Sequence, residues 1–420
     1  MIIKNGTLYT EDGFVKADIK IENGIIKQIA ESINGTADID ATGLVVSPGF
    51  IDLHVHFREP GFEYKETIET GSMAAAKGGF TTVCAMPNLN PTPDTLEELQ
   101  KQLKNIEKTA KVKVLPFGCI TVGEKGETLA EIKEMAPYCV GFSDDGKGIQ
   151  SEELMRNAMK EVQKTGSFIS EHCEVESLLE GGYVHKGTWA EENGHKGISS
   201  ESEYAEVIRN IELAKETGCR FHVCHVSSRE TIDAVRKGKK DGTIVTCEVT
   251  PHHVLQIDED ITEDDGRFKM NPPLRAKADR EAIWQGLQDG TIDAIATDHA
   301  PHSLEEKSKG LAGSAMGVVG AETAFGVLNK GFVEEKNFPL EKLLYLLTFG
   351  PAKVLQKKYG LTEGAQADIV VLDTQEEWTV SGEEFVSKGK VSSFEGYKAK
   401  GKVKYTIVNG EIAYKGEARE

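Results

Sequence analysis

Eight short apolar segments alternate with helical segments through the middle of this 420-residue chain, and this alternation strongly constrains the fold. The apolar segments are LVVSPGFIDLHVH, GFTTVCAMPN, KVKVLPFGCIT, CVGFSDDG, SFISEHCE, CRFHVCHVS, TIVTCEVTPHH and DAIATDHAPH. Amphipathic stretches such as DTLEELQKQLKNIEKTA and SEELMRNAMKEVQKTG separate them. Strands that alternate with helices form a parallel sheet, and eight such units close into a barrel. The sequence therefore predicts an α/β fold, a (β/α)8 TIM barrel.

The two ends of the chain have a different pattern, typical of antiparallel strands. The first forty or so residues alternate apolar and polar side chains, and Asn5-Gly6 and Asn23-Gly24 predict hairpin turns. Strand character returns after about residue 350, in ADIVVLDTQ and KVKYTIVNGEIAY. We expect one small β domain assembled from both chain ends. The predicted boundaries are 1–45 for its N-terminal part, 46–350 for the barrel and 351–420 for its C-terminal part.

Composition narrows the function classes. The net charge of −19 argues against nucleic acid or an anionic membrane as a partner, and it means that an anionic substrate needs a local cation. We find neither a secretory signal nor an apolar run near the roughly 20 residues of a membrane span. The seven cysteines are scattered without a CxxC pair, which disfavours a disulfide framework. A reducing cytoplasm is the expected compartment.

Nearly every apolar segment ends in polar side chains that can do chemistry. Strand ends of a barrel meet at its C-terminal rim, where active sites lie. The residues at these ends are His54, His56, Asn88, Thr121, Asp144, Asp145, His172, His225, His252, His253 and Asp298. Structural histidines would be scattered over helices and loops as well, so the sequence predicts a catalytic site at this rim.

The spacing of these residues indicates a metal site. His54 and His56 are two residues apart on a strand, so both imidazoles project to the same side and can bind one ion. His172 and His225 end neighbouring strands and can bind a second ion. Asp298 ends the eighth strand, where a carboxylate can bind a metal and accept a proton from water.

Two metals about 3.5–4 Å apart need an anionic bridge, and the Asp144-Asp145 pair can supply it. Strand alternation lets only one of the two aspartates face inward. The same rule predicts that His222, three residues before His225, faces the opposite side and is structural.

The motifs IDLHVHFREPG, AMPN, FSDDG, EHCE, HVCHVS, EVTPHH, KMNPPLR and ATDHAPH, in this order, closely resemble the bacterial type I dihydroorotases of the amidohydrolase superfamily. The resemblance covers essentially the whole barrel and extends to EGAQADIVVLD near the C-terminus. It implies two Zn²⁺ ions per chain, bridged by Asp145 and a hydroxide, with Mn²⁺ or Co²⁺ as substitutes. It further implies Asp298 as the catalytic acid–base. The implied metal ligands are His54, His56, Asp145, His172, His225 and Asp298.

Many relatives bridge their metals with a carboxylated lysine at the end of this same fourth strand. No lysine precedes the turn in GFSDDG, and Lys147 lies beyond it, so we expect no lysine bridge here.

Substrate recognition is expected to rest on Arg58, two residues beyond His56, which can form paired hydrogen bonds to a planar carboxylate. Asn88 can add a donor. The resemblance implies that the substrate-binding set is His56, Arg58, Asn88, Asn271, His302, Met316 and Gly317. Met316 stands where relatives often have an aromatic or other apolar residue, which leaves its backbone role intact. The segment between His302 and Met316, rich in small and charged residues, is expected to be a mobile rim loop.

The resemblance implies reversible hydrolysis of (S)-dihydroorotate to N-carbamoyl-L-aspartate in pyrimidine (UMP) biosynthesis. It leaves open a homodimer and an association with an aspartate transcarbamoylase. Two alternatives stand beside it. One is another cyclic amidohydrolase, an allantoinase or a dihydropyrimidinase of the hydantoinase type. The other is a non-catalytic barrel that serves as a partner of a transcarbamoylase, although such a barrel normally lacks some metal ligands.

Overall fold

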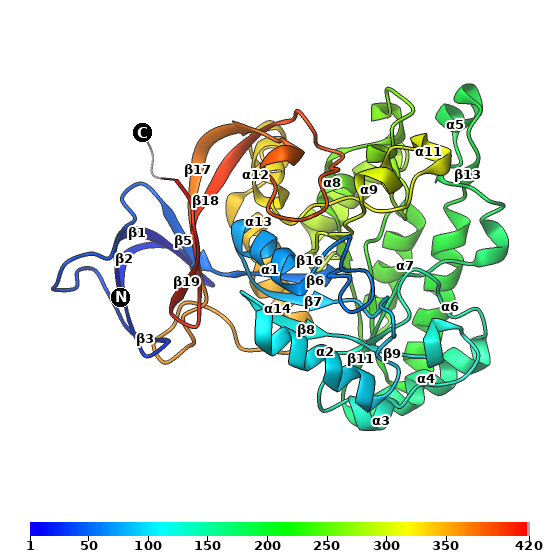
Figure 1. Cartoon of the computed structure of the whole chain (residues 1–420), viewed down its shortest axis with the longest axis horizontal. Helices are drawn as coiled ribbons and strands as arrows, with labels where there is room; N and C mark the ends of the chain where they lie inside the picture. The colour runs from blue at the N-terminus through cyan, green and yellow to red at the C-terminus, as the bar shows by residue number, and fades with distance from the viewer. Residues whose placement is uncertain (418–420) are drawn as a thin grey trace.

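The computed structural model describes residues 1–417, and it contains a closed parallel barrel beside a smaller, mostly antiparallel sheet (Figure 1). The barrel strands are β6 (Phe50–Val55), β7 (Phe80–Ala85), β8 (Lys113–Pro116) with its continuation β9 (Gly118–Cys119), β10 (Phe142–Ser143), β11 (Phe168–Glu171), β14 (Arg220–Val223), β15 (Val245–Val249) and β16 (Ala294–Ile295). A parallel bridge between Val55 and His299 joins the last strand to the first. The predicted TIM barrel is confirmed.

Helices follow the strands and cover the outside of the barrel (Figure 1). They are α1 (Ile68–Lys77), α2 (Leu96–Thr109), α3 (Ile132–Met135), α4 (Glu152–Thr165), α6 (Glu201–Thr217), α7 (Arg229–Lys240), α9 (Lys277–Asp289), α12 (Ala324–Leu328), α13 (Leu340–Leu347) and α14 (Phe349–Val354). Thr95, Ser151 and Ser228 begin α2, α4 and α7, and each hydroxyl accepts a hydrogen bond from the backbone N–H three residues later. Such caps stabilise a helix by about 1 kcal/mol each.

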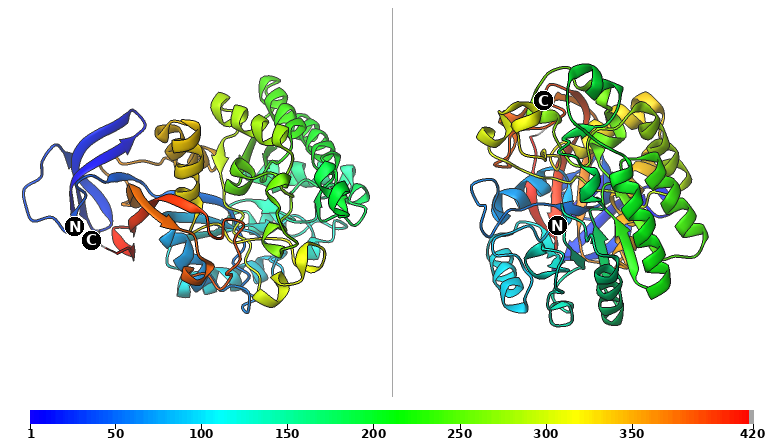
Figure 2. Two further views of the ribbon diagram at one scale, coloured as in Figure 1. Left: turned by 90° about the horizontal axis from the view of Figure 1, so that it is seen from above. Right: turned by 90° about the vertical axis from the view of Figure 1, so that its right-hand side faces the viewer.

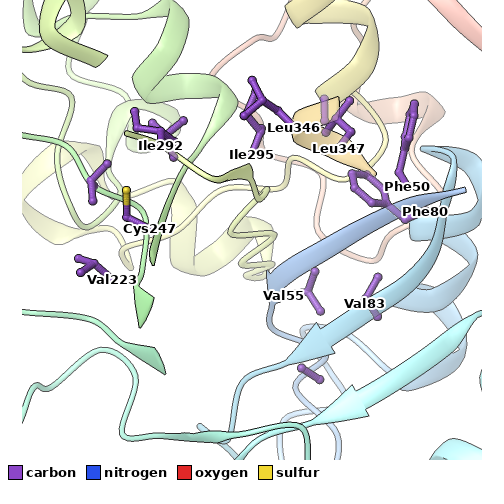
Figure 3. Packing of buried hydrophobic residues seen from close by; sticks show 14 of the residues in the cluster. Phe50, Val55, Phe80, Val83, Val223, Cys247, Ile292, Ile295, Leu346 and Leu347 are labelled. Atoms are coloured by element: carbon purple, nitrogen blue, oxygen red, sulfur yellow. The ribbon is translucent and has the colours of Figure 1, made fainter. Parts of the chain in front are cut away.

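The barrel strands pack against these helices through fully buried side chains. Phe50 of β6 and Phe80 of β7 meet edge to face with ring centroids 5.7 Å apart, near Leu347 of α13 (Figure 3). Val55 and Val83 continue the same core along β6 and β7. Burying one such side chain contributes roughly 1.5–3 kcal/mol, so this layer holds the strand ends in fixed positions.

Several short elements decorate the rim of the barrel. They are α5 (Thr188–Asn193), α8 (Pro251–Leu255), α10 (Leu304–Lys307), α11 (Gly310–Gly313), β12 (Val184–His185) and β13 (Gly197–Ile198). Among residues 1–417, no helix is both long and apolar enough to cross a membrane.

The second sheet is built from both chain ends, as expected, and lies at one side of the barrel (Figure 2). Its strands are β1 (Ile2–Thr10), β2 (Gly13–Glu22), β3 (Ile25–Ala30), β4 (Ile39–Asp40), β5 (Val45–Pro48), β17 (Ile369–Thr379), β18 (Lys398–Val408) and β19 (Glu411–Lys415). Antiparallel pairing of β5 with β17 joins the N-terminal strands to the C-terminal ones. The apolar segment LVVSPGFIDLHVH is therefore two strands, β5 in this sheet and β6 in the barrel, with Gly49 between them.

Two tight turns of this sheet are Asn-Gly pairs, and one of them, Asn23-Gly24, was predicted from the sequence. Asn23-Gly24 joins β2 to β3, and Asn409-Gly410 joins β18 to β19, with positive φ at all four residues as a tight hairpin requires. The prediction for Asn5-Gly6 is wrong. This pair lies inside β1 at a register shift against β2, and the Asn5 backbone N–H donates to Asp18 instead of continuing the ladder.

Candidate metal centre

The polar residues that end the barrel strands converge on one cavity of about 290 Å³. Its walls are His56, Arg58, Asn88, Glu124, Asp145, Gly146, Lys147, His172, His225, Asn271, Asp298, Ala300, His302, Met316 and Gly317. Every residue predicted as a metal ligand or as substrate-binding is in this set except His54. That histidine is fully buried beside the cavity and contacts three of the lining residues.

The first cluster of ligand-type atoms contains His54, His56 and Asp145. The two Nε2 atoms of the histidines are 3.3 Å apart, and His54 Nε2 lies 3.4 Å from Asp145 Oδ1. Asp298 joins this cluster, with its Oδ1 3.1 Å from His56 Nε2 and 3.6 Å from His54 Nε2. Two imidazoles and two carboxylates therefore point at one small volume.

The second cluster contains Asp145, His172 and His225, so Asp145 belongs to both. His172 Nδ1 lies 3.0 Å from His225 Nε2, and Asp145 Oδ1 lies 3.9 Å from that same Nε2. Burial, reinforced by the neighbouring His172 and His54, lowers the pKa of His225 well below its usual value. His225 is therefore neutral at physiological pH, the form that binds a metal.

The atoms of the two clusters fit a metal ion. Asp145, which belongs to both clusters, has its Oδ1 buried without a hydrogen-bond partner among residues 1–417. Burial opposes ionisation of Asp145, but the imidazoles of His54 and His56 outweigh it and hold the pKa of this carboxyl well below its usual range. A buried carboxylate surrounded by imidazole nitrogens is a donor set that suits catalytic zinc.

A layer of polar residues below the clusters orients His54. Glu248 of β15 is fully buried, and its Oε1 accepts a hydrogen bond from His54 Nδ1 at 3.2 Å. Its Oε2 lies 3.2 Å from His222 Nε2, and His222 Nδ1 contacts Thr246 Oγ1 at 2.8 Å. Carboxylates that hold a metal-binding histidine in this way fix its ring orientation and tautomer. Glu248 is not among the residues predicted from the sequence.

The structural role predicted for His222 agrees with these contacts, but its predicted direction is wrong. His222 Nε2 lies 3.2 Å from the buried carboxylate of Glu248, which also contacts His54, so His222 points into the barrel interior. β14 ends at Val223, and His225, beyond it, has a φ of 29°. Strand alternation therefore does not extend to His225. Cys224 also lies within ligand distance of His54 and Glu248. Burial raises the pKa of the Cys224 thiol to about 12, so it stays protonated and is a poor ligand.

The two aspartates of the fourth strand point to different places, as strand alternation predicts. Asp144 accepts hydrogen bonds from the backbone N–H groups of Ile120 and Thr121 at 2.8 and 3.0 Å and from the Thr121 hydroxyl. It thereby ties the ends of the third and fourth strands together and leaves Asp145 to face the cavity. Lys147 Nζ donates to the backbone oxygen of Glu124 at 3.1 Å.

One wall of the cavity carries the cation that an anionic substrate requires. Arg58 Nε donates to the backbone oxygen of Pro301 at 3.3 Å, which aims the guanidinium along the wall beside His302. His302 Nε2 donates to the backbone oxygen of Met316 at 2.8 Å. Burial, with the charges of Arg58 and Lys65, lowers the pKa of His302 to about 3, so the ring is neutral.

Both asparagines of the predicted substrate set also support metal-site histidines. Asn88 Oδ1 accepts from His56 Nδ1 at 2.7 Å, and Asn88 Nδ2 donates to the backbone oxygen of Asp145 at 2.6 Å. Asn271 Nδ2 donates to Glu174 at 2.9 Å and lies 3.3 Å from His172 Nε2. Asn271 Oδ1 has no hydrogen-bond partner within the described part of the chain, so it is free for a ligand.

Two histidines and one loop segment of the rim lie or fold differently from what the sequence predicts. His252 and His253 lie in α8 outside the cavity wall, where His253 Nε2 donates to the backbone oxygen of Pro272. The segment 303–315, expected to be a mobile loop, folds into α10 and α11. Lys307 Nζ ties it down by donating to the backbone oxygens of Lys269 and Ala315 at 2.9 and 2.7 Å.

Comparisons with known proteins agree with this geometry. Residues 43–231 match the family model described as dihydro-orotase-like, and residues 253–414 match that of the amidohydrolase family. The dihydroorotase of Fusobacterium nucleatum is 48% identical over 99% of this chain and 98% of its own length. The dihydroorotase of Geobacillus thermodenitrificans is also 48% identical, over 100% of both chains. Among solved structures, L-hydantoinase (dihydropyrimidinase) from Arthrobacter aurescens superposes with a TM-score of 0.88 at 27% identity, covering 100% of this chain and 97% of that one.

A parallel barrel with histidines and aspartates clustered at its C-terminal rim defines a metal-dependent amidohydrolase. The full-length relatives narrow this class further. The chain belongs to the dihydroorotase family.

Proposed function

We propose that this enzyme is a dihydroorotase, which catalyses the reversible hydrolysis of the cyclic amide of (S)-dihydroorotate to N-carbamoyl-L-aspartate in pyrimidine (UMP) biosynthesis. The observation that carries the proposal is the placement of Arg58 on the wall of the cavity that the His/Asp clusters line. In a chain of net charge −19, this local cation is what a substrate carboxylate needs. The dihydroorotases to which the chain is 48% identical over nearly its whole length support the same substrate.

We propose two Zn²⁺ ions per chain, with Mn²⁺ or Co²⁺ as substitutes. His54, His56 and Asp298 would hold one ion, His172 and His225 the other, and Asp145 both, since it belongs to both clusters. When bound, the ions supply Lewis acidity, which lowers the pKa of water and polarises a carbonyl.

Asp298 is the proposed catalytic acid–base. Its carboxylate lies on the cavity wall, and its Oδ1 is 3.1 Å from His56 Nε2. The backbone at Thr297 is fixed by Asp52, whose carboxylate accepts from the Thr297 N–H at 3.0 Å and from its hydroxyl at 2.6 Å. Asp298 accepts the proton of the attacking water and then delivers it to the departing amide nitrogen.

Arg58 is proposed to hold the substrate carboxylate through paired hydrogen bonds, which orients the ring with its scissile amide toward Asp298. His302 holds the carbonyl of Met316 in place, and Gly317 brings backbone to the cavity wall where no side chain intervenes. His56, Asn88 and Asn271 complete the proposed substrate-binding set.

The second candidate is a hydantoinase-type enzyme, because the superposed solved structure is an L-hydantoinase (dihydropyrimidinase). The two candidates differ in the carboxylate, which dihydroorotate has and dihydrouracil and hydantoin lack. Steady-state turnover of the three rings by the purified enzyme separates them. We expect kcat/KM for dihydroorotate to exceed that for either of the others by at least tenfold, and a preference for dihydrouracil or hydantoin would replace the proposal with the second candidate.

The proposed partner of the enzyme is its small-molecule substrate, and cytoplasm is the proposed compartment. A homodimer and an association with an aspartate transcarbamoylase are proposed from the resemblance alone. Light scattering of the purified chain, with and without the transcarbamoylase from the same organism, measures both. An unchanged monomer mass would reject both assemblies.

A further inference from the structure

The backbone of the cavity wall is strained at particular residues. Among residues 1–417, six that are neither glycine nor asparagine have a positive φ, a conformation that costs such residues of order 1–3 kcal/mol. Four of the six line the cavity: Arg58 at 53°, Glu124 at 53°, His225 at 29° and Asp298 at 47°. Strain of this kind gathers at functional sites. Three of the four are already assigned to the site, and Glu124 is the fourth.

Glu124 is buried in the cavity wall, and one of its carboxyl oxygens is unpaired among residues 1–417. Glu124 is 5% exposed, and its Oε1 is buried without a hydrogen bond to any described residue. The nearby ammonium of Lys147 donates to the backbone oxygen of Glu124. Burial, with the charges of Asp144 and Asp145, raises the pKa of Glu124 to about 8. A buried polar group left unpaired destabilises the fold, so the stability of the chain does not explain this glutamate, and a bound ligand would.

The other hydrogen-bond acceptors of the cavity are mostly occupied. Asn88 Oδ1 accepts from His56, and the Met316 carbonyl accepts from His302. Asp145 and Asp298 face the metal clusters. Outside the metal clusters, Asn271 Oδ1 and Glu124 Oε1 are the buried side-chain acceptors of the cavity wall that have no hydrogen-bond donor within residues 1–417.

We propose that Glu124 is a substrate-binding residue that accepts a hydrogen bond from an N–H of the ureido group, the N–CO–N unit present in both the ring and the opened product. The inference rests on the proposed function, which defines this substrate. Dihydrouracil contains the same ureido group without the carboxylate. Glu124 therefore binds the ureido group that the two rings share, whereas Arg58 binds the carboxylate that only dihydroorotate has.

Two variants and one control test the proposal in the metal-loaded enzyme. Glu124→Gly removes the carboxylate at a position where φ of 53° suits glycine, so the backbone is kept. Glu124→Gln keeps the size and an acceptor oxygen. Glu127→Ala alters an exposed glutamate of the same loop and serves as the matched control. The readouts are kcat and KM for dihydroorotate and dihydrouracil, metal content, and the thermal unfolding midpoint.

We expect Glu124→Gly to raise KM for dihydroorotate about tenfold and to lower kcat/KM for dihydrouracil by a similar factor, since one hydrogen bond is lost from each complex and an N–H of the substrate is left unpaired. Glu124→Gln should restore most of the loss, and Glu127→Ala should match the wild type. Metal content and the unfolding midpoint should not fall in Glu124→Gly.

An unchanged KM, or an effect confined to dihydroorotate, overturns the inference. A fall in metal content or unfolding midpoint with KM unchanged also overturns it, because Glu124 would then be structural. Absence of wild-type turnover of dihydroorotate defeats the proposed function itself and the inference with it, an outcome that the wild-type measurement reports separately.

Discussion

Substitution of Glu248 by glutamine probes how the buried layer below the cavity prepares the metal centre. Glu248 is fully buried, with one carboxylate oxygen 3.2 Å from His54 Nδ1 and the other 3.2 Å from His222 Nε2. Glutamine has the same size, but it loses the negative charge and turns an N–H₂ group toward one of the two ring nitrogens that face the carboxylate. His54 would then lose the partner that fixes its ring and directs Nε2 toward the cluster.

Removal of such an outer carboxylate typically weakens metal binding about 10–100-fold, which corresponds to roughly 1.4–2.7 kcal/mol. The assay is a titration of metal-free enzyme with Zn²⁺ in competition with a chromophoric chelator. Thr246→Val is the matched control, because it removes only the contact of His222 that lies farther from the metal cluster. A Glu248→Gln enzyme that folds normally and binds zinc as tightly as the wild type would refute the assigned role.

Four further predictions follow from the site and its surroundings. Arg58→Ala should raise KM for dihydroorotate about 10–100-fold and narrow its advantage over dihydrouracil, because a charge-assisted hydrogen bond is worth roughly 1.5–3 kcal/mol; equal harm to both rings would make Arg58 structural. Asp298→Asn should lower kcat by about 10²–10⁴-fold through loss of acid–base catalysis, and near-normal single-turnover rates would contradict that role. Reactivation of metal-free enzyme by zinc should not depend on bicarbonate, since the proposed bridge between the metals is Asp145 and not a carboxylated lysine. A requirement for bicarbonate would contradict Asp145 as the bridge. Burial beside Arg275 lowers the pKa of His185 to about 4, so the unfolded chain binds more protons between about pH 4 and 6.5 and stability is lost as pH falls through this range. His185→Gln should therefore lose about 2 kcal/mol less of its unfolding free energy than the wild type between pH 7 and pH 5, measured by urea unfolding, and equal losses would contradict the assignment.

The barrel and most of its rim could be predicted from the sequence because both follow from simple periodicities. Eight apolar segments alternate with helices, and each segment ends in polar residues, so the parallel topology alone brings those residues to one end. His54 and His56 are predictable in the same way, since residues two apart on a strand share a face.

Residues beyond the strand ends were harder to place, because alternation does not hold where the backbone leaves the extended region. The direction of His222 relative to His225 was mispredicted for this reason, since φ at His225 is 29°. Glu248 lies one strand away from the nearest predicted ligand, and nothing in EVTPHH distinguishes it from a surface glutamate. Glu124 ends a single helical turn, Val122–Glu124, where a sequence carries no periodic signal.

The small sheet also has one feature that follows from a local sequence pattern and one that depends on a tertiary contact. Asn23-Gly24 has alternating strands on both sides and forms the predicted hairpin, whereas Asn5-Gly6 has the same letters and is a bulge inside β1. The difference comes from Asp18 on the neighbouring strand, whose carboxylate accepts the Asn5 N–H. A local motif does not report that tertiary contact.

The most direct test of the account is the rate at which dihydroorotate is consumed, followed by loss of its far-ultraviolet absorbance, before and after removal of metal by a chelator. The untreated enzyme should convert dihydroorotate to N-carbamoyl-L-aspartate. The chelated enzyme should lose at least about 99% of that rate, because the Lewis acid is gone. Added Zn²⁺ should restore the rate. Full activity after complete metal removal, or no turnover of dihydroorotate by the zinc-loaded enzyme, would contradict the account.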